Sequence, residues 1–158
     1  TIKVGIMLGK FFQNLFGSAE KAAEAPQDER LALAVLMVRL ARTDYEYVLE
    51  ERAEIVAILQ RRYGLDDVAV EKLVDRAEEA EAQPHDNVYF TKQIKEMVAF
   101  DKRADVMEDL WSLALADGQR DNEENGFLRL ICSLLGLSDP ESAFARQRAQ
   151  AKIKGSDS

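Results

Sequence analysis

The sequence predicts an all-α protein, a helical bundle of two pseudo-repeated helical hairpins with flanking helices. Apolar residues recur at helical spacing, whereas no segment alternates apolar and polar residues for long. The three prolines stand outside the apolar periodic runs, so none interrupts a predicted helix. A stretch of the chain is also written twice. A short unit needs a second copy against which to bury its apolar face, so the two copies should pack together.

The repeat starts with Ala-Arg-Thr-Asp at residues 41–44, which returns as Ala-Leu-Ala-Asp at residues 114–117. Each copy continues with a Glu-Glu pair and, after an apolar run, a Gly-Leu pair, at residues 50–51 and 64–65 in the first copy and 123–124 and 136–137 in the second. An Asp and a Glu therefore stand at equivalent points of one fold.

The first half of the chain begins with an amphipathic helix, predicted over residues 2–16, and a linker of Gly, Ser, Ala, Glu and Pro over residues 17–27. The next helix should cover residues 28–42. Its centre is apolar on nearly every side, which is typical of a buried central helix. A third helix, over residues 49–63, should stop at Gly64, because glycine readily adopts the left-handed conformation that ends helices.

The middle of the chain predicts two further helices. Asp66 or Asp67 should cap an acidic surface helix that reaches about residue 82. The break at Pro84 separates it from a fifth helix over residues 88–99.

The second hairpin is predicted from helices over residues 103–116 and 122–135, the latter stopping at Gly136. Ser138 and Glu141 form a capping box for a last helix, and residues 153–158 should be a loose tail. The expected organisation is residues 1–27 as N-terminal helix and linker, 28–152 as helical domain and 153–158 as tail. We expect five apolar residues at the centre of the core: Leu36, Leu40, Leu110, Leu113 and Ile131.

The composition of the chain narrows the range of functions and cellular locations to be considered. A net charge of -8 argues against nucleic-acid binding, which needs clustered Lys and Arg, but suits a cation or a basic partner. The single cysteine, Cys132, allows no internal disulfide, and we expect it to be buried. The low cysteine content and the lack of a recognisable secretory signal together favour a cytoplasmic location. We expect the helix over residues 2–16 to pack on the bundle or a partner chain; insertion into a membrane interface is the alternative.

The loop over residues 117–124 allows two interpretations. As structure, Asp121 caps the next helix and Glu124 closes a capping box. As function, its carboxylates bind a hard cation such as Ca²⁺ or Mg²⁺, although the EF-hand pattern is missing.

The first copy of the loop favours the second interpretation somewhat. Val48 stands where Asp121 stands, so the capping box is expected to be lost, yet Asp44 and Glu51 remain. If the two loops lie at one end of the bundle, they could pool their carboxylates around one divalent cation. The predicted ligands are Asp44, Glu51, Asp117 and Glu124.

Residues 28–150 resemble the TerB-like family, the helical domain named for tellurite resistance. The specific motif is Leu-Trp-Ser-Leu-Ala-Leu-Ala-Asp-Gly at residues 110–118, supported by Phe-Thr-Lys at residues 90–92. The resemblance implies an all-α bundle of two halves, no catalytic activity, and metal binding by the four acids named above. Tyr45 replaces a glycine common in the first loop, and Asn125 stands where relatives commonly carry histidine.

These observations predict a non-enzymatic binding or scaffolding module, tied to tellurite or another stress response. We expect a protein partner, whose identity the sequence leaves open, as it does self-association. The first alternative is a metal-dependent hydrolase that uses the same carboxylates. It would need a nearby base or nucleophile, and the one histidine, His85, lies in a polar break. The second alternative is a structural interaction domain without metal.

Overall fold

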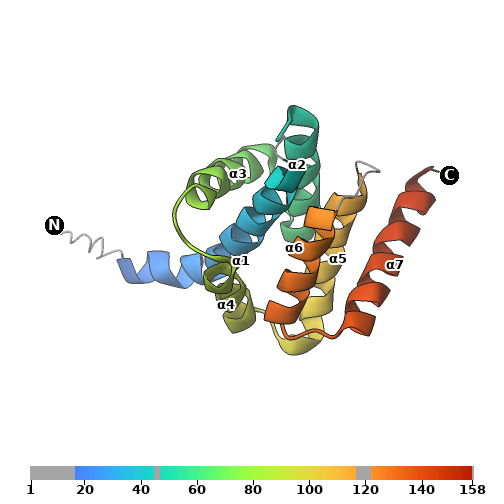
Figure 1. The fold of residues 1–158 in the computed structure, drawn as a ribbon. Coiled ribbons are helices and arrows are strands. Elements are labelled where there is room, and N and C mark those ends of the chain that lie inside the picture. The colour runs from blue at the N-terminus through green and yellow to red at the C-terminus, as the bar shows by residue number, and fades with distance from the viewer. Residues whose placement is uncertain (1–16, 45–46, 117–121, 158) are drawn as a thin grey trace.

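Helices form the regular structure of this protein. The computed structural model describes residues 17–44, 47–116 and 122–157, with the side chains of residues 29–43, 47–116 and 124–155. This part of the chain contains α-helices and two short 3-10 helices but no strand, which confirms the predicted all-α class (Figure 1). The elements are α1 (Gly17–Ala41), η1 (Arg42–Asp44), α2 (Leu49–Tyr63), α3 (Asp67–Glu81), α4 (Asn87–Met97), η2 (Phe100–Lys102), α5 (Arg103–Ala116), α6 (Asn122–Leu134) and α7 (Asp139–Asp157).

Helix α1 is the central helix of the bundle. It contacts α2, α3, α4, α5 and α6, and α7 packs along α5 on the outside (Figure 1). Residues 32–38 of α1 are wholly buried because neighbours surround them on every side. The continuous apolar run predicted this central position.

The two halves of the chain pack in the same way. In each half the first helix makes its most extensive contacts with the third, α1 with α3 and α5 with α7. The halves also contact each other reciprocally, since α2 touches α5 and α6 touches α1. Reciprocal contacts of this kind are what a two-fold relation requires. The similar packing includes a third helix in each half besides the predicted hairpins, as the repeat of Asp67 and Arg76-Ala77 at Asp139 and Arg148-Ala149 indicates.

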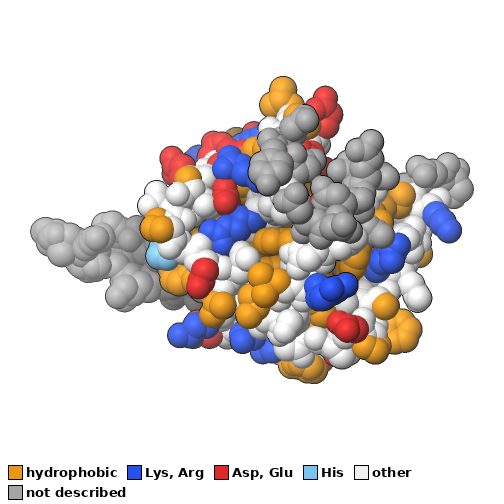
Figure 2. Space-filling view, viewed as in Figure 1, with side chains coloured by type: hydrophobic (Ala, Val, Ile, Leu, Met, Phe, Trp, Pro, Cys, Tyr) orange, Lys and Arg blue, Asp and Glu red, His pale blue; other side chains and the backbone are white. Residues whose placement is uncertain are grey.

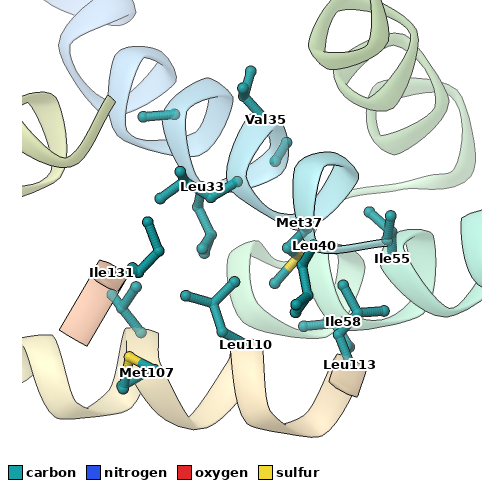
Figure 3. Packing of buried hydrophobic residues seen from close by; sticks show 14 of the residues in the cluster. Leu33, Val35, Met37, Leu40, Ile55, Ile58, Met107, Leu110, Leu113 and Ile131 are labelled. Atoms are coloured by element: carbon teal, nitrogen blue, oxygen red, sulfur yellow. The ribbon is translucent and has the colours of Figure 1, made fainter. Parts of the chain in front are cut away.

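Side chains from α1, α2, α5 and α6 meet in one core (Figure 3). All five predicted core residues are buried: Leu36, Leu40, Leu110, Leu113 and Ile131. Cys132 is also buried, as expected, and its thiol donates to the backbone oxygen of Leu137 at 3.4 Å.

Several predicted helix ends are confirmed by their geometry. Gly64 and Gly136 adopt left-handed conformations with φ of 63° and 80°. A side-chain oxygen of Asp66 accepts from the backbone N–H of Ala69 at 2.8 Å and caps α3. The Ser138–Glu141 box is complete: the Ser138 hydroxyl accepts at 3.2 Å from the Glu141 N–H, and the Glu141 carboxylate accepts at 2.8 Å from the Ser138 N–H.

Two predicted irregular segments are helical instead. Helix α1 begins at Gly17 and so includes the expected linker, while α7 continues to Asp157 through the expected loose tail. Ala, Glu and Lys dominate residues 19–25, and their helix propensity outweighs the breaking signals of the flanking Gly and of Pro26. The helix predicted over residues 2–16 lies outside the described residues. No helix in the described ranges combines the length and apolar character that a bilayer crossing demands.

Buried carboxylates of α5 form ion pairs with two neighbouring helices, α7 and α2. Glu108, 6% exposed, accepts from the Arg148 guanidinium at 2.7 Å and pairs with Lys152, which holds α7 on α5. Burial acts to raise the pKa of Glu108, but hydrogen bonds from these two cations outweigh it and hold the pKa below its usual value. The neighbouring Asp109 pairs with Arg62 of α2 at 2.8 Å.

Candidate functional site

A cavity of about 210 Å³ lies where the two halves of the bundle meet. The first helices of both halves end at it, and the second helices begin at it, as their lining residues show. Its described lining consists of Leu40, Ala41, Glu50, Glu51, Glu54, Leu113, Ala116 and Glu124. Apolar side chains therefore form part of the wall, and carboxylates form most of its polar surface.

Residues at equivalent repeat positions line this cavity. Leu40 corresponds to Leu113, and Glu51 corresponds to Glu124. Each Glu belongs to the first turn of its helix, so the shared hairpin geometry brings both to the same place. The structure therefore brings together two of the four predicted ligands from loops more than 70 residues apart in sequence.

The other two predicted ligands, Asp44 and Asp117, are close in sequence to residues that line the cavity. Asp44 is the last residue of η1 and follows Ala41 by three positions, but its side chain is not among those described. Asp117 directly follows the lining residue Ala116 and lies outside the described residues, as does Asp121, the predicted cap of α6.

Two further lining acids, Glu50 and Glu54, were not predicted. Glu50 and Glu54 are four residues apart on α2, and Glu51 and Glu54 are three apart. Side chains at these spacings share one face of a helix, so the pattern could have been recognised from sequence. What the sequence does not show is that this face of α2 turns toward the other half.

The electrostatic character of the cavity is acidic. Four glutamates line it, and Glu124 is only 5% exposed. The described lining contains neither Lys nor Arg. Carboxylates close to an apolar wall repel one another more strongly than in water, because the local dielectric is lower. Among the described side chains, no three Asp, Glu, His or Cys residues group in a way that could hold a metal ion, so these glutamates alone do not make a metal centre.

The expectation that the first copy has lost its cap is partly wrong. Glu51 stands at the third position of α2, and its carboxylate accepts from the backbone N–H of Val48 at 3.2 Å. In a capping box the third helical residue accepts from the backbone N–H of the residue that precedes the helix. Glu51 does this although Val48, the preceding residue, has no polar side chain. Capping therefore accounts for part of the persistence of Glu51, and the shared cavity becomes the stronger reason to consider a cation.

The glutamates are the only groups on the described lining that could take part in acid–base or nucleophilic chemistry, since it holds no His, Cys, Ser, Thr, Tyr or Lys. His85 lies elsewhere, exposed, with its ring stacked on Tyr89 at 4.2 Å between centroids. Cys132 is buried, and burial raises the pKa of its thiol. The described cavity can thus concentrate negative charge and accept hydrogen bonds or a cation.

Comparison with known proteins identifies the family. A family model described as tellurite resistance protein TerB matches residues 30–147. The matched segment starts in α1 and ends in α7, so it includes both copies of the repeat and all four predicted ligands. Searches of curated proteins and of solved structures returned no match. Because the model matches well over half of the 158 residues, the chain belongs to the TerB family.

Proposed function

We propose that this protein is a non-enzymatic binding module that takes a divalent cation, Ca²⁺ or Mg²⁺, into the acidic cavity between its halves. The observation that carries the proposal is that the repeat-equivalent Glu51 and Glu124 line one cavity together with Glu50 and Glu54. Asp44 and Asp117, adjacent to the lining in sequence, would supply the further oxygens.

The chemistry of this donor set suits a hard cation. Ca²⁺ takes about six to eight oxygen ligands, and Mg²⁺ about six with several waters retained. A cavity of about 210 Å³ leaves room for such waters beside the carboxylates. A bound cation would also offset the negative charge of the lining glutamates, and because it binds only the folded state it should stabilise the folded protein.

A cation between the halves would link the loop ends of both hairpins and favour one arrangement of that end of the bundle. We propose that this end then serves as a scaffold for a protein partner in the cytoplasm, as part of a response to tellurite or another stress. A metal-dependent hydrolase is the second candidate. The described lining favours the binding module, because no nucleophile or proton-transfer group accompanies the carboxylates.

Calorimetric titration of metal-stripped protein with Ca²⁺, Mg²⁺, Mn²⁺ and Zn²⁺ tests this proposal, together with thermal melting in chelator and in millimolar cation. The wild-type melting temperature should rise with cation concentration. The free energy of unfolding should rise by about 2.7 kcal/mol when the cation stands at a hundredfold excess over its dissociation constant. Glu124→Gln should abolish the rise. Glu51→Gln should reduce it while keeping the cap, because Gln also accepts the Val48 N–H.

Glu79→Gln is the matched control, since Glu79 is an exposed acid of α3 that does not line the cavity. It should respond to cation as the wild type does. Asp117→Asn tests the sequence-predicted ligand in the same assay. If the wild-type melting temperature moves no more than that of Glu124→Gln, the acids are helix caps and solvated surface, and the metal-free structural domain is the better account. Metal-dependent hydrolysis of phosphate esters or peptides, lost in Glu124→Gln, would instead favour the enzyme.

A further inference from the structure

A second cavity, of about 790 Å³, opens between α5, α6 and α7, and its polar lining differs from that of the acidic cavity. Two guanidinium groups, three amides and one carboxylate contribute to it: Arg129, Arg146, Asn125, Gln147, Gln150 and Asp139. The ring of Trp111 and the hydroxyl of Ser142 form part of the wall.

Arg129 and Arg146 supply the positive charge of this cavity. The chain carries a net charge of -8, and five other arginines form ion pairs with carboxylates: Arg39, Arg42, Arg52, Arg62 and Arg148. Within the described part of the chain, neither Arg129 nor Arg146 forms an ion pair. Figure 2 shows Lys and Arg side chains on the face formed by α6 and α7. The cavity therefore carries more positive than negative charge on its described lining.

The Arg146 guanidinium is held in place before any ligand arrives. Its central carbon lies 5.5 Å from the centre of the Trp111 ring, a cation–π arrangement. The Trp111 indole N–H donates to the Ser142 hydroxyl at 3.0 Å, which fixes the ring beneath the guanidinium. The Arg146 Nε–H is covered from solvent and has no hydrogen-bond partner among the described residues. A ligand in the cavity would accept hydrogen bonds from the terminal Nη groups.

We propose that this cavity binds a small organic anion bearing carboxylate or phosphate groups. A planar guanidinium donates two parallel hydrogen bonds to either group, and a stacked guanidinium loses little freedom on binding. The three amides can hold neutral polar parts of the same molecule. The volume is typical of small-molecule sites, which bury their ligand in a concave pocket with a few convergent polar groups. This site shares no described lining residue with the acidic cavity, so the two proposals stand independently.

The single tryptophan gives a direct assay, because Trp111 lines the cavity and no other tryptophan contributes fluorescence. Fluorescence is titrated with succinate, with its neutral diamide succinamide and with inorganic phosphate, at constant ionic strength set by sodium chloride. Succinate or phosphate should produce a saturable change, and succinamide none. The comparison of the two anions distinguishes carboxylate from phosphate recognition.

Substitutions then test the two arginines separately. Arg129→Gln and Arg146→Gln should each weaken anion binding by about tenfold or more, the loss expected for one charge-assisted pair. Arg76→Gln makes the same charge change at an exposed position of α3 and should bind as the wild type does. The contact with the Trp111 ring is made by Arg146, so Arg129→Gln remains informative if Arg146→Gln impairs folding, which circular dichroism would show.

The proposal is overturned if neither anion gives a saturable change, or if binding survives either substitution at wild-type strength. Saturable binding of an acidic peptide without binding of succinate or phosphate would also overturn it, in favour of a protein partner at this face.

Discussion

Leu110 offers the sharpest test of how the two halves are held together. It belongs to α5, has no exposed surface, and lies among side chains of α1, α2 and α6 (Figure 3). Leu110→Ala removes three buried carbons, each worth about 0.8 kcal/mol of transfer free energy, or about 2.4 kcal/mol together. The cavity left behind adds to this loss, because surrounding helices relax only in part. We expect a total of about 3–4 kcal/mol, inside the usual range of about 2–5 kcal/mol for buried leucines.

The assay is urea denaturation followed by far-UV circular dichroism. If wild type and Leu110→Ala both unfold in two states, the slope of the unfolding free energy against urea concentration should be the same for the two proteins. For a chain of this size, the melting temperature should fall by about 2–4 °C per kcal/mol. Leu130→Ala is the matched control, because the Leu130 side chain on α6 is 45% exposed. A loss below about 1 kcal/mol for Leu110→Ala, or a loss equal to that of the control, would refute the central position of Leu110.

Three other predictions concern single sites. In urea denaturation, Gly126→Ala should stabilise the protein by about 0.5–1 kcal/mol, whereas Gly64→Ala should destabilise it by about 1–2 kcal/mol. An added Cβ meets open space at both positions, but of the two only Gly64 has a positive φ. The pKa of Glu108 is lowered on folding, so its ionised form contributes stability above the unfolded pKa of about 4.3, which is lost as pH falls through the folded pKa. The stability gap between wild type and Glu108→Gln, measured by denaturation, should therefore shrink between about pH 5 and pH 3. Cys132 should react slowly with thiol reagents at neutral pH, because burial raises its pKa.

Each of these three has a plain contradicting result. Equal signs for the two glycine variants would show that backbone conformation does not control their effects. A stability gap that stays constant or widens toward low pH would show that the Glu108 ion pairs add nothing in the folded state. Cys132 labelling as fast in native protein as in denaturant would show that the thiol is accessible.

Local rules of the chain were sufficient for most helix ends. Gly64, Asp66 and the Ser138–Glu141 box act through residues within five positions of themselves, so their roles can be read without knowing the fold. The start of α1 was misjudged because Pro26 and Gly17 were weighted above the helix-forming residues between them. Glu51 was misjudged because a cap was sought only in the side chain that precedes the helix.

The residues of the two candidate sites also differ in how far the sequence predicts them. Glu51 and Glu124 could be paired from sequence, because a repeat implies equivalent places in one fold. Glu50 and Glu54 required the orientation of α2 toward the other half. The arginine-lined cavity had no sequence signal, since Arg129 and Arg146 come from different helices that only packing brings together.

The sequence by itself determined the helical class, the family, the repeat and five central residues of the core, because periodicity and capping depend on neighbours along the chain. Only the tertiary structure decided that acids from both halves share a cavity and that two arginines without ion-pair partners in the described structure line another. Those facts depend on which faces of separate helices meet. Packing of the whole bundle sets these relative orientations, and no single segment carries them.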